Sequence, residues 1–206
     1  MKIESVEMLS DDAAKVFTDE IDCAYLRLSY LRELPRERIC AGETVTEDEK
    51  NEIADAALAF AAERKAEDYL ARCEQSRAGL TRKLLQKEYG KKYIEMALDY
   101  LESKKYLSDE RYAASWLRMH CSTKLQGRTR LASELMARGI SRQTAQQALD
   151  EFFADNDEEE ICRRAFLKAC RKKSGEKLIK FLADSGFPYK MITKVMSKTP
   201  EPDDEV

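Results

Sequence analysis

At 206 residues, with 36% charged and 43% hydrophobic residues, the chain can form one or two domains with a buried core and a heavily charged surface. No apolar run approaches the length of a membrane span and no signal peptide is visible, so we expect a cytoplasmic protein that makes no contact with membranes. The net charge of -3 is unevenly distributed: residues 1–62 carry 7 basic and 15 acidic side chains, whereas residues 161–198 carry 11 basic and 2 acidic ones, which suggests a polyanion-binding surface at the basic end.

The first 48 residues are predicted to form a small strand-containing segment. Ala24, Leu26 and Leu28 alternate with Tyr25, Arg27 and Ser29, which is the pattern of a strand with one buried face. A short helical segment over residues 29–34 is an equally good interpretation of the same region. The expected strands cover residues 2–8, 15–18 and 21–28, with a turn at Asp19 and Glu20.

The remainder of the chain repeats one unit of about fifty residues three times. A shift of 51 positions places Leu131 under Leu80, and a further shift of 47 places Leu178 under Leu131, with no gap inside the aligned stretch. Self-similarity at a fixed period is typical of tandem-repeat architectures. The predicted fold class is therefore mainly α, a tandem array of three three-helix modules after a small β or irregular segment.

Helix boundaries are indicated by capping residues. Thr46 and Glu49 form a capping-box pattern before a long helix over residues 49–73, and Ser76 and Ser108 are placed to cap later helices. Arg138-Gly139-Ile140-Ser141 is a helix stop followed by a start, and Gly186 with Pro188 occupies the same place in the third copy. The helices that open the second and third modules are expected over residues 109–121 and 159–172. The predicted segments are 1–48, the modules 49–106, 107–155 and 156–198, and a flexible acidic tail at 199–206.

Catalytic chemistry finds little support in the sequence. The chain has no phosphate-binding glycine loop and no nucleophile elbow, and the neighbours His120 and Cys121 would not face each other on a helix. The six scattered cysteines form no CxxC pair, and one histidine supplies no Cys/His ligand set. We therefore predict a protein with no catalytic residues, no metal site and no cofactor.

The basic residues are the strongest binding candidates. Lysine and arginine side chains that neutralise phosphates give sequence-independent, salt-sensitive affinity. The alternative is that they form solvated helix faces, and for any single residue this is at least as good an interpretation. Trp116 could stack on a base, but its spacing from Tyr112 and Leu117 favours a core position. The predicted partner-binding or DNA-binding residues are Arg77, Arg82, Lys83, Lys87, Arg128, Arg130, Arg138, Arg142, Arg171, Lys172, Lys173, Lys177 and Lys180.

The stretch from Tyr69 to Phe152 contains, in this order, Leu70-Ala71-Arg72, Ser76-Arg77-Ala78-Gly79-Leu80, Leu107-Ser108-Asp109-Glu110-Arg111-Tyr112-Ala113, Gly127-Arg128-Thr129-Arg130-Leu131 and Arg138-Gly139-Ile140-Ser141. With these pieces in this order, the stretch resembles the RecX family, the regulators of the RecA recombinase. The sequence departs from the family pattern at one turn and from its own repeat at another. Gly127 is followed by Arg128, whereas members of the family often have proline after this glycine, and the first module has Glu88-Tyr89 where the other two copies have glycine.

The resemblance implies a monomeric, non-enzymatic modulator that binds RecA filaments, with single-stranded DNA within or beside the filament. It would inhibit ATP hydrolysis, strand exchange and filament extension, and so act in homologous recombination, DNA repair and the SOS response. A stand-alone helical nucleic-acid-binding protein or transcription regulator is the alternative, and an enzyme is a third, less favoured one. The sequence leaves open the angles between modules and which basic residues meet protein or DNA.

Overall fold

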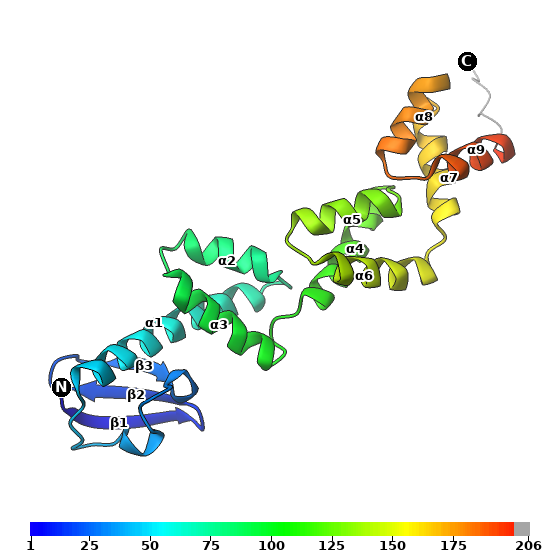
Figure 1. Cartoon of the computed structure of the whole chain (residues 1–206). Coiled ribbons are helices and arrows are strands. Elements are labelled where there is room, and N and C mark those ends of the chain that lie inside the picture. Colours follow the sequence, from blue (N-terminus) through cyan, green and yellow to red (C-terminus); the bar gives the residue numbers. More distant parts are fainter. Residues whose placement is uncertain (200–206) are drawn as a thin grey trace. The chain divides into compact units, whose positions relative to one another are not determined.

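The computed structural model describes residues 1–199 and divides into two units, Met1–Leu107 and Ser108–Val206. Over the described residues a three-stranded sheet is followed by nine α-helices (Figure 1). The predicted fold class, mainly α with a small N-terminal β segment, is therefore confirmed. Beyond Thr199, the predicted acidic tail lies outside the described residues.

The first unit begins with an antiparallel sheet in the order β1 (Ile3–Ser10), β2 (Ala13–Thr18) and β3 (Ala24–Arg27). The turn predicted between the last two strands is closed by Thr18, whose hydroxyl accepts a hydrogen bond of 2.9 Å from the Ile21 N–H. The third strand is shorter than predicted, because the chain enters the 3-10 helix η1 (Leu28–Tyr30) directly after it. A second 3-10 helix, η2 (Arg36–Arg38), follows before the first long helix.

The helix α1 (Glu47–Leu70) packs its apolar side against the sheet (Figure 1). It begins at the predicted capping box, where the Thr46 hydroxyl accepts from the Glu49 N–H and the Glu49 carboxylate accepts from the Thr46 N–H at 2.8 Å. Ile53 and Leu26 lie fully buried in the shared core. The helix therefore covers one sheet face.

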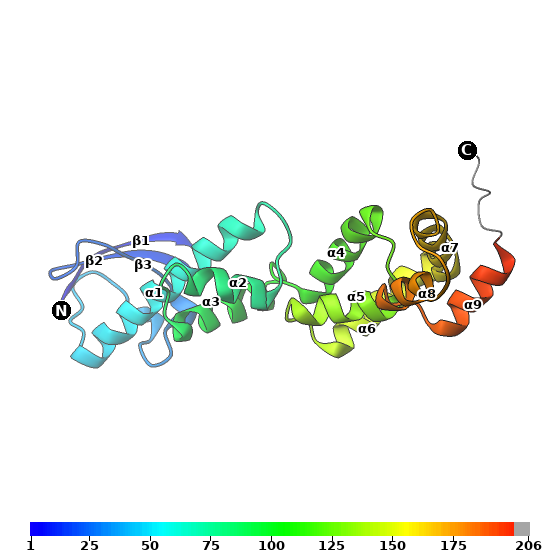
Figure 2. The same cartoon turned by 90° about the horizontal axis from the view of Figure 1, so that it is seen from above.

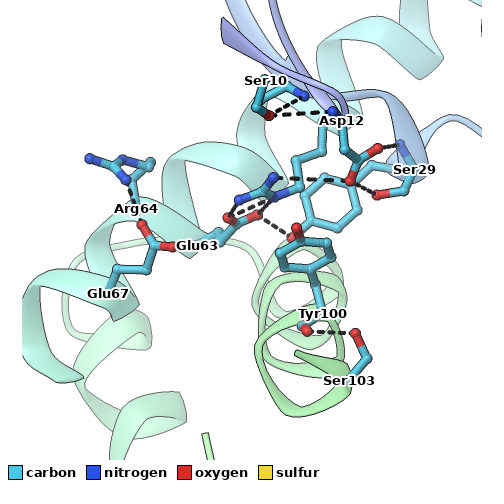
Figure 3. Close-up of polar contacts among 11 residues, drawn as sticks. Ser10, Asp12, Ser29, Glu63, Arg64, Glu67, Tyr100 and Ser103 are labelled. Carbon is cyan, nitrogen blue, oxygen red and sulfur yellow. Dashed lines mark hydrogen bonds and ion pairs between the residues drawn. The ribbon is translucent and has the colours of Figure 1, made fainter. Parts of the chain in front are cut away.

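A buried carboxylate, Glu63, lies at the edge of this core and is not indicated by the sequence pattern. It accepts hydrogen bonds from Arg27 Nε at 2.7 Å and from the Tyr30 hydroxyl at 2.6 Å. The ring of Tyr100, on the later helix α3 (Lys91–Ser103), lies 4.0 Å from the Arg27 guanidinium (Figure 3). Burial alone would lower the pKa of Arg27, but its hydrogen bond to Glu63 and the Glu63 charge outweigh burial and raise that pKa. Burial, reinforced by Glu63, raises the pKa of Tyr30, so its phenol stays protonated and donating. The sheet and the helices are thus joined by charge as well as by apolar packing.

The first three-helix module is completed by α2 (Arg77–Leu85) and α3 (Lys91–Ser103). The Ser76 hydroxyl accepts from the Gly79 N–H at 3.1 Å, so the predicted cap is present. Its core contains Leu80, Leu84, Ile94 and Leu98, which are the repeated apolar positions of the sequence.

The carboxylate of Asp55 ties α3 to α1. It accepts from the Lys92 ammonium and, at 2.7 Å, from the Tyr93 hydroxyl. The hydrogen bond from Lys92, followed by the one from Tyr93, lowers the pKa of Asp55 below its usual 3.8. The ionised carboxylate is therefore the form that holds the two helices together.

The second unit opens with α4 (Asp109–Thr123), α5 (Arg128–Ala137) and α6 (Arg142–Asp155). Their core is built from Leu117, Leu131, Leu135 and Leu149, all of them fully buried. The predicted serine caps are present, since the side chains of Ser108 and Ser141 accept from the backbone at the starts of α4 and α6.

The third bundle consists of α7 (Glu158–Ala169), α8 (Gly175–Asp184) and α9 (Tyr189–Lys198). Phe166, Leu178, Leu182 and Ile192 form its core. The first of these helices ends three residues earlier than predicted, because the backbone after Cys170 turns toward α8.

The turn between the second and third helices of each module has the same backbone conformation in all three copies, with one residue of positive φ. Gly139 and Gly186 have φ values of +87° and +94°, and Glu88 at the equivalent place of the first module has +64°. The first module therefore has the same left-handed residue at this turn although Glu88 replaces glycine there. This conformation is strained for a residue with a side chain.

Backbone contacts join the two bundles of the second unit, where α5 begins beside the end of α8 (Figure 2). The Gly127 N–H donates to the Ser185 carbonyl at 2.9 Å, and the Arg128 N–H donates to the Glu158 carboxylate at 2.8 Å. A Cβ at Gly127 would lie 2.6 Å from the carbonyl carbon of Gly186, and a Cβ at Gly186 would lie 2.5 Å from the Arg130 Cβ. Both glycines are therefore needed for this close approach.

Candidate partner-binding surface

In the first module, two residues of the predicted binding set are engaged by their own module. Arg77 on α2 donates to Asp99 at 2.7 Å and to Glu102 at 2.6 Å, both on α3. Lys83 lies 4.9 Å over the Tyr69 ring. These two cations therefore have a packing role that is independent of any partner.

Two arginines of the second module are engaged in a similar way. Arg128 pairs with Asp150 of α6, and Arg138 pairs with Glu134 at 3.2 Å. The Arg138 guanidinium also lies 4.5 Å over the ring of Trp116. This tryptophan is half-buried against the module core, in line with the core position favoured for it.

The other residues of the predicted set have exposed side chains, and most of them lie in the third module. Three other cations of that module are paired with Glu159 or Glu160 at the start of α7. Within residues 1–199 no acidic side chain pairs with the third-module members of the set. The exposed members are Arg82, Lys87, Arg130, Arg142, Arg171, Lys172, Lys173, Lys177 and Lys180.

A groove of about 430 Å³, which we call the lysine groove, lies between the loop after α4 and the helices α7 and α8. Leu125, Ala165, Ala169 and Phe181 provide its apolar lining. Its rim carries the lysines Lys124, Lys168, Lys172 and Lys173, all exposed.

The predicted binding set contains only Lys172 and Lys173 from this rim. Lys168 lies four positions before Lys172 within the helix predicted over residues 159–172, and this spacing could have pointed to it, although α7 ends at Ala169 and Lys172 follows it. Lys124 belongs to the preceding module and is brought to the groove by the close approach at Gly127, which no local pattern reveals.

The neighbours His120 and Cys121 have no arrangement that would activate a nucleophile. The His120 Nε2 lies 2.7 Å from the Gln126 side-chain oxygen, and its ring stacks on Trp116 with 4.2 Å between the ring centres. Burial raises the pKa of the Cys121 thiol to about 11, whereas a reactive cysteine needs a lowered one. Over the described part of the chain, no group of three His, Cys, Asp or Glu side chains is placed to bind a metal, and no helix is long and apolar enough to cross a membrane.

Family models for two successive three-helix domains match the helical modules. The model described as the first three-helix domain of RecX matches residues 62–101, and the model of the second matches residues 108–149. The regulatory protein RecX of Treponema pallidum (strain Nichols) is 34% identical over 134 residues, which cover 65% of this chain and 82% of that protein. The chain belongs to the RecX family.

The likeness to other RecX proteins extends beyond these two modules. RecX of Clostridioides difficile (strain 630) is 26% identical over 205 residues, covering 96% of this chain and 93% of that protein. A crystal structure of regulatory protein RecX has the same fold, with a TM-score of 0.77 at 22% identity, over 95% of this chain and 98% of the other. RecX from Lactobacillus salivarius superposes with a TM-score of 0.61 over 69% of this chain and 97% of the other.

Membership in RecX gives the chain a regulatory role, since its relatives carry the name regulatory protein. RecX is not a known enzyme family, which is consistent with the raised pKa of Cys121. The predicted family is thereby confirmed, and the choice of individual binding residues stays a prediction.

Proposed function

We propose that this RecX protein binds RecA recombinase filaments on single-stranded DNA and inhibits their ATP hydrolysis, strand exchange and extension. Family membership supports the choice of partner. The excess of cations in the third module is the observation that carries the mode of binding, since 11 basic and only 2 acidic residues lie between positions 161 and 198. Of these 11, only Arg163, Lys194 and Lys198 pair with an acidic side chain within residues 1–199.

Electrostatics explains why this surface suits the proposed partner. A filament on DNA is an elongated polyanion, and each phosphate neutralised by a lysine releases condensed counterions. A cation already paired with an acid would first have to give up that partner, whereas Lys172 and Lys173 have no such pair among the residues described. Successive modules of a repeat array can contact successive parts of one long partner.

A titration into assembled filaments tests the proposal. RecA would be assembled on circular single-stranded DNA, and its ATP hydrolysis would be followed as purified protein is added at up to equal molar amounts. We expect hydrolysis to fall at or below one protein per RecA monomer. Unchanged hydrolysis over this range refutes the proposal, and tight binding to one duplex sequence without RecA would support the stand-alone DNA-binding alternative.

Charge reversal tests the binding surface. The double variant Lys172→Glu/Lys173→Glu should weaken inhibition, and Arg128→Glu/Arg130→Glu should do so if the second module also contributes. The control is Arg64→Glu/Lys65→Glu, two neighbouring cations of α1 outside the predicted set. Arg64 is exposed and Lys65 half-buried, and they pair with Glu67 and Asp68 of the same helix. Far-UV circular dichroism checks the fold of each variant. Full inhibition by folded Lys172→Glu/Lys173→Glu would reject these residues.

A further inference from the structure

The lysine groove combines two properties that define what it can bind. Lys124, Lys168, Lys172 and Lys173 surround it, and no acidic side chain of residues 1–199 pairs with any of them. Its apolar lining includes Phe181, a residue that is 40% exposed and over whose ring the Lys173 ammonium lies at 5.4 Å. A short acidic peptide with a few apolar side chains matches both properties, because its carboxylates can meet the ammonium groups while its apolar groups cover the lining.

The chain itself contains such a peptide directly after α9. Residues 200–206 read Pro-Glu-Pro-Asp-Asp-Glu-Val, with four acidic residues, two prolines and one valine. We propose that residues 200–206 dock in the lysine groove of the same chain and compete there with external polyanions. This inference concerns the chain alone and holds whether or not the partner is a RecA filament.

Chain geometry allows this contact. The Lys198 ammonium at the end of α9 lies 3.6 Å from the Glu159 carboxylate in the first turn of α7. Ala169 of the groove is ten residues further along the same helix, about 15 Å away at 1.5 Å per residue. The residues from Thr199 to Asp204 span up to about 20 Å when extended, so the later acidic positions, Asp204 and Glu205, can reach the rim lysines.

The strength of this contact can be bounded. Exposed ion pairs contribute little individually, so an isolated peptide of this sequence should bind the groove only weakly. Tethering supplies an effective concentration on the order of 1 mM. A peptide dissociation constant between about 0.1 and 1 mM then gives a closed-to-open ratio between about 10 and 1, which lowers the apparent affinity for a competing polyanion by about 2- to 10-fold.

Carbodiimide coupling followed by mass spectrometry tests the contact directly. The reagent joins a carboxylate to a touching lysine amine with loss of water, so it reports ion pairs without a spacer. We expect links from residues 201–205 to concentrate on the four rim lysines at low salt and to disappear at 0.5 M NaCl, where exposed charges are screened. Lys194 and Lys198 are excluded from scoring because they adjoin the peptide in sequence.

Matched variants show whether the groove or general charge attracts the peptide. Lys172→Gln/Lys173→Gln should remove links to the groove, whereas Lys177→Gln/Lys180→Gln changes two exposed lysines of the same module outside the groove and should leave them. Links spread evenly over exposed lysines of both units would overturn the proposal. In a mixture of isotopically light and heavy protein, links between copies would also overturn it, because they would place the peptide in a second molecule.

Competition gives a second readout that needs no RecA. The variant Glu201→Gln/Asp203→Asn/Asp204→Asn/Glu205→Gln of the 206-residue chain should bind oligo(dT) about 2- to 10-fold more tightly at low salt. The same substitutions combined with Lys172→Gln/Lys173→Gln should give a smaller gain, since the shared site is weakened. An equal gain in both backgrounds would mean that the acids act by general repulsion and would refute docking in the groove. Failure of the RecA titration would leave these outcomes unaffected.

Discussion

Substitution of Gly186 by alanine should separate the two bundles of the second unit. Its φ of +94° is unfavourable for alanine, which costs about 1–2 kcal/mol, and the new Cβ would lie 2.5 Å from the Arg130 Cβ. Overpacking of this kind costs about 1–3 kcal/mol when backbone has to move. We therefore expect Gly186→Ala to lose about 2–5 kcal/mol of unfolding free energy, the sum of these two ranges.

Alanine substitutions at two other glycines measure the cost of the positive φ and the cost of overpacking separately. Gly175 has a φ of +54° and nothing within 4 Å of its Cβ position, so Gly175→Ala should lose only the conformational part, about 1 kcal/mol. Gly127 has an ordinary φ of -84°, and its Cβ would meet the backbone of Gly186, so Gly127→Ala should lose only the packing part. Together the three variants distinguish strain in one turn from collision between two bundles.

Denaturation by urea, followed through the fluorescence of the single tryptophan, Trp116, measures the loss in the second unit. Hydrogen exchange at the Gly127 N–H, which donates to the Ser185 carbonyl, reports whether the bundles part before they unfold. Faster exchange in Gly186→Ala than in Gly175→Ala is expected. If Gly186→Ala is no less stable than Gly175→Ala and exchanges no faster, the close approach does not hold the bundles together.

Four further predictions concern single residues elsewhere. Glu88→Gly should raise stability by up to about 1 kcal/mol in a urea titration, because glycine relieves the left-handed φ of +64°; a loss would contradict this. Glu63→Ala should cost about 3–5 kcal/mol, because it leaves the half-buried Arg27 guanidinium with only the more distant Asp12, at 4.0 Å, as an acidic partner. Tyr30→Phe should cost about 2 kcal/mol, and equal losses would refute the account of the cluster. Because the pKa of Asp55 is lowered in the folded protein, its ionised carboxylate stabilises the fold fully above the usual pKa of 3.8. This stabilisation is lost as the pH falls through the lowered pKa of the folded state, so the thermal unfolding of Asp55→Asn should depend less on pH below 4 than that of the unsubstituted protein. Arg128→Ala should change the unfolding free energy by less than about 1 kcal/mol, since Arg128 is only half-buried and its partner Asp150 is exposed, and a larger loss would mark the residue as structural.

Local patterns predicted the helices well because the signals for them lie within a few residues. The apolar positions that repeat at Leu80, Leu131 and Leu178 are all buried, since each faces two neighbouring helices of its own module. The caps at Thr46 and Ser108 depend on a hydroxyl and an N–H only three residues apart. Such features form wherever the same short segment becomes helical.

Long-range features could not be predicted in this way. Glu63 is charged and sits in a helix rich in surface acids, so its complete burial follows only from Arg27, which is 36 residues away in another element. The lysine groove joins Lys124 to Lys172 through contacts of Gly127 with the third module. No repeat period or local motif predicts that Glu63 lies against Arg27 or that Lys124 lies near Lys172, because each contact joins residues that are far apart in the sequence.

The distribution of internal ion pairs separates residues that hold the fold from residues available for recognition. Arg77 and Arg138 stabilise their own modules, so a substitution at either would confuse loss of binding with loss of structure. Lys172 and Lys173 pair with no acidic side chain among residues 1–199, whereas Lys194 and Lys198 of the same module pair with Glu159. Repulsion among the lysines that lack such a pair opposes the compact state. Lys172 and Lys173 are therefore available for recognition, either by the acidic residues 200–206 of the same chain or by an external polyanion. Variants at Lys172 and Lys173 therefore report recognition more directly than variants at any arginine of the first two modules that is engaged with an acid.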